Sequence, residues 1–146
     1  IADWRRRRMS ELQIGDIVAE RQVHLSRESL VRYAGASGDF NPIHYRDDVA
    51  ERVGLPGVLA HGMLTMGLAV ETAVPWLGDS GRIIEYGVRF TKPVIVDAEN
   101  GADLTIVAKV GALDNVDGTE TARIDLTVTF DGTVVLVKAQ LRVRLP

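Results

Sequence analysis

The sequence of 146 residues contains no cysteine, so disulfide bonds and metal sites built from thiolates are excluded. It also contains no apolar run near the roughly 18 residues that a membrane-spanning helix requires. No basic segment is followed by the short apolar stretch that marks a secretory signal peptide. These absences favour a cytoplasmic protein with no contact with a membrane.

Negative charge outnumbers positive charge outside the first few residues. The formal net charge is −3, and residues 1–8 hold four arginines against Asp3, so residues 9–146 carry a net charge of −6. A nucleic-acid interface needs a basic face, so we expect no nucleic-acid partner.

The arginine-rich start is set apart from the rest of the chain. The sequence begins at Ile1, whereas the segment from Met9 resembles an ordinary start. We therefore expect residues 1–8 to be an extension outside the domain, and residues 9–146 to form one domain of ordinary size.

Hydrophobic periodicity divides the chain into a helical first half and a strand-rich second half. Ser26 is suited to cap a short helix, and Asp47–Val53 predicts another. The residues from Gly62 to about Val74 are apolar on almost every side, which predicts a buried core helix ended by Pro75 and Gly78. Segments rich in Val, Ile and Thr predict strands. The predicted strands are Ile17–Leu25, Ile83–Phe90, Leu104–Val110, Thr121–Phe130 and Val134–Leu145.

The order of these elements predicts the architecture. Asp131-Gly132, between the last two predicted strands, is a strong signal for a two-residue hairpin, and Asp117-Gly118 marks another turn. A long buried helix followed by sequential antiparallel strands predicts an α+β fold in which the sheet curls around the helix. The open edges of so small a sheet favour the pairing of two subunits.

Polar chemistry is concentrated between Gly38 and His44, which read G-D-F-N-P-I-H. Asp39 is charged at neutral pH and His44 titrates near it, so the two form a natural acid–base pair. Gly38 and Pro42 are unfavourable inside a helix or a central strand, which predicts a shaped loop of the kind that carries catalytic groups. The same residue types are also common in simple turns, where Asp and Asn side chains bond nearby backbone N–H groups.

The residues around this loop resemble the signature of the MaoC-like, (R)-specific enoyl-thioester hydratases. That signature is an aromatic residue, a spacer, G-D-x-N-P-[ILV]-H, five further residues and a small residue. Here the aromatic residue is Tyr33 and the small residue is Ala50. The segments A-H-G-M-L-T-M-G (residues 60–67) and E-Y-G-V-R-F (residues 85–90) are together most similar to the catalytic B subunits of actinobacterial (3R)-hydroxyacyl-carrier-protein dehydratases.

The resemblance implies a single hot-dog fold, an antiparallel sheet wrapped around a long central helix. It implies reversible hydration of trans-2-enoyl thioesters of CoA or acyl carrier protein, in a homodimer or in a heterodimer with a related hot-dog subunit. Asp39 and His44 would hold the water, and the backbone N–H of Gly62, at the start of the helix, would polarise the thioester carbonyl. No cofactor or metal ion would take part, and His61 would be structural. The supporting residues would be Gly38, Asn41 and Pro42.

Three other interpretations fit parts of the sequence. A hot-dog acyl thioesterase would use a carboxylate such as Glu71, but this residue lies about 13 Å along the helix from Gly62, too far to act on the same carbonyl. The chain would alternatively be a subunit that is active only in a heteromeric dehydratase. The third interpretation is a metal site, whose ligands would be Asp39, His44 and His61.

Overall fold

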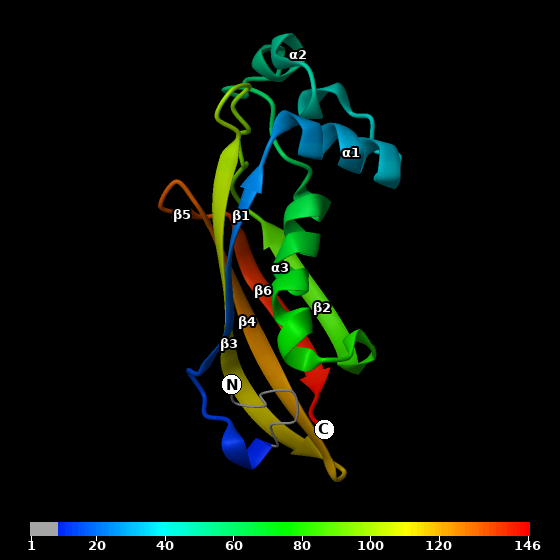
Figure 1. The fold of residues 1–146 in the computed structure, drawn as a ribbon, viewed down its shortest axis with the longest axis vertical. Helices are drawn as coiled ribbons and strands as arrows, with labels where there is room; N and C mark the ends of the chain where they lie inside the picture. Colours follow the sequence, from blue (N-terminus) through cyan, green and yellow to red (C-terminus); the bar gives the residue numbers. More distant parts are fainter. Residues whose placement is uncertain (1–8) are drawn as a thin grey trace.

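An antiparallel sheet forms the body of the molecule (Figure 1). The computed structural model describes residues 9–146, so the extension expected at residues 1–8 lies outside the described residues. The strands lie in the order β1-β3-β4-β6-β2, and a short strand β5 pairs with β4. Their bounds are Ile17–Leu25 for β1, Ile83–Phe90 for β2, Ala102–Val116 for β3, Thr119–Phe130 for β4, Thr133–Val134 for β5 and Leu136–Arg144 for β6.

The longest helix, α3 (Gly62–Leu77), lies along one face of this sheet (Figure 1). Its buried residues recur at helical spacing, and they pack against the side chains that β3 and its neighbours turn inward at every second position. Register shifts in the pairs β1–β3, β3–β4 and β2–β6 mark irregularities that bend the strands around the helix. The hot-dog architecture and the α+β class are thus confirmed. In the part of the chain described, no helix is long and apolar enough to cross a membrane.

Two smaller helices, α1 (Arg27–Ser37) and α2 (Asp47–Arg52), lie together beyond one end of α3 (Figure 1). Ser26 caps α1 as predicted, because its hydroxyl accepts the Ser29 N–H while the Ser29 hydroxyl accepts the Ser26 N–H. The remaining helical pieces among residues 9–146 are single 3-10 turns. They span Met9–Glu11, Pro42–His44 and Ser80–Arg82.

Several predicted boundaries are confirmed, and others differ for physical reasons. β1 and β2 have the predicted bounds, and both Asp-Gly turns adopt positive φ angles at each residue, as two-residue hairpin loops require. β3 extends to Val116 because its polar end pairs with β4 through the Asp117-Gly118 turn. The last predicted strand is interrupted at Val135, whose carbonyl instead accepts the Thr91 N–H.

The central helix differs from the prediction in length and in burial. It continues through Pro75 to Leu77 and ends at Gly78, because a proline in the last turn removes one hydrogen bond without preventing the final residues from packing. Burial on almost every side was wrong. Met63 is 58% exposed and Gly67 is exposed, since a single chain covers only one face of α3.

Candidate active site

The loop between α1 and α2 is shaped by the residues that the motif supplies. Gly38 ends α1 in the left-handed conformation at φ 76°, which a residue with a side chain rarely adopts, and its N–H bonds the Ala34 carbonyl. Asn41 caps the 3-10 turn Pro42–His44 by accepting the Ile43 N–H at 3.2 Å. The Asn41 N–H donates to Asp39 Oδ1 at 3.2 Å. Asn41 therefore braces both the turn and the Asp39 carboxylate.

This loop brings Asp39 and His44 together. Asp39 Oδ2 lies 3.9 Å from His44 Nε2, with the carboxylate half exposed and the imidazole buried. His44 Nδ1 lies 2.7 Å from the Leu59 carbonyl oxygen, which can only accept a hydrogen bond, so Nδ1 carries the proton. In the neutral ring Nε2 is then an unprotonated acceptor that faces the carboxylate.

His61 contacts both residues of this pair. Its ring stacks on His44 with the centroids 3.8 Å apart, and its Nε2–H donates to the Asp39 carbonyl at 3.1 Å. His61 Nδ1 is buried and has no hydrogen-bond partner among the described residues. Burial, followed by the nearby His44, lowers the pKa of His61 despite the bond to Asp39. His61 is therefore neutral and fixes the Asp39 backbone.

Two further residues of the motif explain its spacing. The Tyr33 ring, from α1, packs against the His61 ring, with the ring centroids 4.8 Å apart. Ala50 lies on α2 and is completely buried, so a larger side chain there would displace the helix that follows the loop.

A cavity of about 490 Å³ opens beside the pair, and its walls hold Asp39, His61 and Gly62 together. Gly62 is the first residue of α3, so its N–H has no acceptor within the helix and lies at the positive end of the helix dipole. A β-carbon on Gly62 would lie 2.9 Å from the Phe90 ring, so any larger residue here requires that exposed ring to move aside. His44 does not line the cavity but contacts two residues that do, Asp39 and His61.

The arrangement places one hydrogen-bond acceptor, Asp39, and one N–H donor, Gly62, in the wall of a mostly apolar cavity. The second acceptor, His44, contacts the wall residues Asp39 and His61. Asp39 Oδ2 and His44 Nε2 are too far apart to bond directly, and a water molecule between them could donate one hydrogen to each. A carbonyl oxygen at the start of α3 would meet the free N–H of Gly62. Such a site can activate water toward an atom next to a polarised carbonyl.

The same three side chains come within range for a metal ion, since ligand atoms of Asp39, His44 and His61 all lie within 4.8 Å of one another. The geometry fits a metal poorly. Stacked rings, here inclined by only 22°, direct their in-plane lone pairs along nearly parallel planes rather than toward one point.

The resemblance implied a structural role for His61, and the sequence grouped it with Asp39 and His44 only as possible metal ligands. The ring contacts His44 directly and forms part of the cavity wall. Neither the Leu59 carbonyl nor Phe90 was identified, because no local pattern marks a backbone acceptor or a ring that arrives from a distant strand.

Comparison with known proteins is consistent with this geometry. The model of a family described as MaoC like domain matches residues 12–130. The 3-hydroxyacyl-thioester dehydratase X of Mycobacterium tuberculosis is 40% identical over 70 residues, which are 48% of this chain and 24% of that protein. A solved MaoC-like dehydratase is 39% identical, with a TM-score of 0.88 over 94% of this chain and 42% of that one. An R-hydratase from Pseudomonas aeruginosa is 27% identical, with a TM-score of 0.76 over 94% of this chain and 84% of that one. The chain thus spans less than half the length of the first two relatives.

Proposed function

The chain belongs to the MaoC-like domain family, and on that premise we propose that it adds water to trans-2-enoyl thioesters and catalyses the reverse dehydration of (3R)-hydroxyacyl thioesters. The observation that carries this proposal is the Asp39–His44 pair, held 3.9 Å apart next to a cavity that the N-terminus of α3 also lines. The acyl group would be carried by CoA or by an acyl carrier protein, whose thioesters present the same reacting atoms.

The first part of the mechanism is activation of water. Asp39 Oδ2 and His44 Nε2 both accept hydrogen bonds from the water, which turns its lone pair toward C3 of the enoyl group. Nε2 takes the proton as the C3–O bond forms, because a neutral imidazole is a stronger base than a carboxylate. The Asp39 carboxylate and the Leu59 carbonyl then face the imidazolium and stabilise its charge.

The second part of the mechanism is the movement of the electron pair of the C2–C3 double bond. Attack at C3 moves charge through C2 to the thioester oxygen, where the Gly62 N–H meets it at the positive end of α3. The imidazolium returns its proton to C2, so that one water supplies both the hydroxyl group and the hydrogen. Dehydration uses the same groups in the opposite order. No step needs a cofactor or a metal ion.

Glu71, the carboxylate that a thioesterase would use, does not lie at the candidate site. Glu71 forms an ion pair with Arg21 of β1 at 3.0 Å and is absent from the walls of the cavity that holds Asp39 and Gly62. It faces a separate depression between β1 and α3. The site therefore favours addition of water to the double bond over hydrolysis of the thioester.

We expect the purified protein to convert trans-2-enoyl thioesters to the (3R)-hydroxy product in the presence of EDTA. The measurement combines loss of enoyl absorbance with chiral analysis of the product, using crotonyl and long-chain enoyl groups on both CoA and acyl carrier protein. A (3S) product, or release of free thiol while the enoyl absorbance persists, would contradict the proposal.

We also propose that the site is completed by a second hot-dog subunit, either another copy or a related chain. The cavity is lined by Phe90 at the end of β2, and β2 is an edge strand with an unpaired side. Met63, Ile84 and Phe90 leave a large apolar surface exposed along this edge and the neighbouring face of α3. A partner placed here would cover that surface and extend the cavity wall.

Light scattering at micromolar concentration is expected to give about twice the chain mass of 15.9 kDa, or a multiple of it. Ile84→Glu, which places a charge on the exposed β2 edge, should shift the protein toward monomer and reduce turnover. Val116→Glu is the matched control, because Val116 is equally apolar and exposed but lies at the tip of the β3–β4 hairpin. A wild-type monomer with full activity would refute the assembly.

A further inference from the structure

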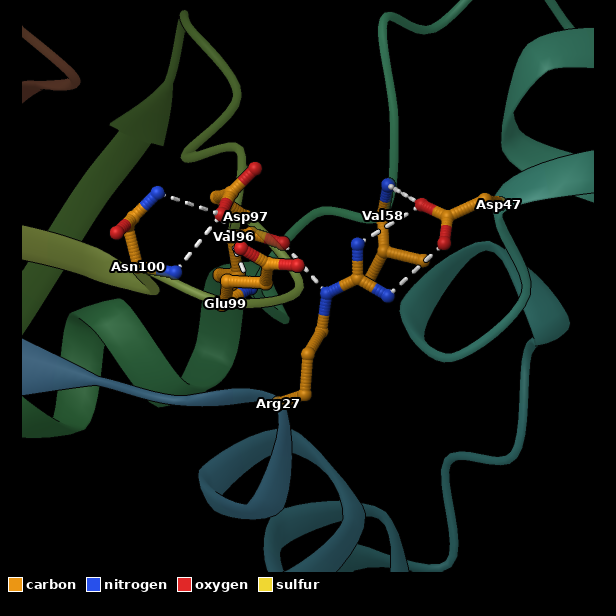
Figure 2. Close-up of polar contacts among 7 residues, drawn as sticks. All are labelled: Arg27, Asp47, Val58, Val96, Asp97, Glu99 and Asn100. Atoms are coloured by element: carbon orange, nitrogen blue, oxygen red, sulfur yellow. Dashed lines mark hydrogen bonds and ion pairs between the residues drawn. The ribbon is translucent and has the colours of Figure 1, made fainter.

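The guanidinium of Arg27 joins three segments that are far apart in the sequence (Figure 2). Its Nη1 and Nη2 donate to the two carboxylate oxygens of Asp47 at 3.1 and 2.8 Å. Its Nε donates to the Val96 carbonyl at 2.5 Å. This fork geometry is specific to arginine, because lysine presents a single point charge.

The contacts of Arg27 close into a ring of hydrogen bonds. The Val96 N–H donates to the Val58 carbonyl at 2.9 Å, and the Val58 N–H donates to Asp47 Oδ1 at 3.3 Å. Figure 2 shows Arg27 between Val96 on one side and Asp47 with Val58 on the other. We refer to Arg27, Asp47, Val58 and Val96 as the Arg27 clasp.

The clasp is connected to both halves of the active site. Arg27 and Asp47 are the first residues of α1 and α2, the helices that flank the Asp39–His44 loop. Val58 precedes Leu59, whose carbonyl binds His44 Nδ1 and whose N–H donates to the Ile43 carbonyl at 3.3 Å. The same stretch continues through His61 to Gly62. The clasp thus fixes the loop that holds the water relative to the helix start that would hold the carbonyl.

The expected contribution of the clasp is to geometry more than to stability. The Arg27 side chain is 25% exposed and the Asp47 carboxylate 51% exposed, and ion pairs open to solvent add little to the free energy of unfolding. Catalysis is more sensitive, because a displacement of about 1 Å in a reacting group is sufficient to slow turnover by as much as a hundredfold.

From this geometry we propose that Arg27 is a positioning residue, which acts through Asp47 and Val58 to hold His44 and Gly62 in register with each other. The kinetic part of this inference rests on the proposed hydratase function. The structural part does not, so the two can fail separately.

Asp47→Ala tests the proposal, with Asp48→Ala as its matched control. Asp48 is the next residue of α2, is about equally exposed and is bound by two arginines, Arg46 and Arg52. Within the described residues, its hydrogen bonds and ion pairs involve only these two arginines and do not reach the segments at Val58 or Val96. Asp47→Ala is expected to lower kcat about tenfold with KM within about twofold, whereas Asp48→Ala leaves kcat unchanged. Arg27→Lys should behave like Asp47→Ala, since lysine cannot make the forked contact.

A double-mutant cycle and a spectroscopic signal separate positioning from general destabilisation. In a His44→Gln background Asp47→Ala should slow the residual rate by less than about twofold, because the group that it positions is gone. The protein has three histidines, so ¹⁵N-labelled imidazoles can be assigned individually by NMR. The His44 Nδ1–H signal should shift or exchange rapidly in Asp47→Ala and stay unchanged in Asp48→Ala.

Each result has a definite meaning. Equal kcat values and equal His44 spectra in Asp47→Ala and Asp48→Ala would refute the positioning role of the clasp. A tenfold loss of the residual rate on adding Asp47→Ala to the His44→Gln variant would refute it as well. A wild-type protein with no turnover on enoyl thioesters, combined with the expected change at His44, would defeat the proposed function and retain the positioning role.

Discussion

We expect Asp39→Asn and His44→Gln each to lower kcat for enoyl-thioester hydration by more than about a hundredfold, the scale for removing a positioned acid or base. Asn at position 39 can still accept the Asn41 N–H, so the loop keeps its shape while the charge that faces His44 is lost. Gln at position 44 fills much of the buried space but has no group that titrates near neutrality. Steady-state kinetics gives kcat for each variant, and thermal unfolding of the same samples gives its unfolding temperature.

The chain offers a matched control for this pair. His24 Nδ1 and Asp103 Oδ1 lie 2.7 Å apart on β1 and β3, and both side chains are exposed outside the cavity. His24→Gln and Asp103→Asn should therefore leave kcat unchanged within about twofold. Near-normal turnover in either Asp39→Asn or His44→Gln would show that the two side chains do not act as the water-binding pair.

The stability of these variants should differ, because the two side chains differ in burial. Asp39 and His44 lie on the same loop, but only one of them is enclosed by the protein. Asp39 is exposed, but His44 is only 8% exposed and gives up its bond to the Leu59 carbonyl when it is replaced. An unsatisfied buried carbonyl costs about 1–3 kcal/mol, so His44 variants are expected to unfold at a lower temperature than Asp39 variants.

Local signals in the sequence predicted the elements that local interactions determine. Ser26 caps α1 through a bond to a residue three positions away, and the Asp-Gly turns depend only on their own backbone angles, so both could be read from a few letters. The Asp39–His44 loop belongs to the same class. Its shape comes from Gly38, Asn41 and Pro42, whose hydrogen bonds stay within four residues.

The features that could not be predicted depend on contacts between distant segments. The tautomer of His44 is set by Leu59, and the neutral state of His61 is set by burial against Tyr33 and His44. The exposed face of α3 is another example. An apolar helix is read as buried, but how much of it one chain can cover depends on the width of the sheet and on β2 being an edge.

Gly62→Pro is expected to lower kcat by about 10² to 10³, because it removes the one N–H that is proposed to bind the developing oxyanion. Few substitutions can delete a backbone donor without disturbing the fold, and this position permits one. Gly62 is the first residue of α3, where proline is favoured and the missing N–H has no intrahelical partner. His61 has φ −59° and ψ 131°, an extended conformation that a residue before proline adopts readily.

Gly62→Ala is the control that isolates the N–H from the side chain. Both variants add a β-carbon that would lie 2.9 Å from the Phe90 ring, so both require the ring, which is 52% exposed, to move aside. Only the proline variant loses the donor. We therefore expect the two variants to unfold at similar temperatures. Their kcat values should differ by most of the loss of about 10² to 10³ that is expected for Gly62→Pro, whereas KM should change less. Equal kcat values in the two variants would show that the start of α3 does not stabilise the thioester oxygen, and that its glycine serves the packing of Phe90 alone.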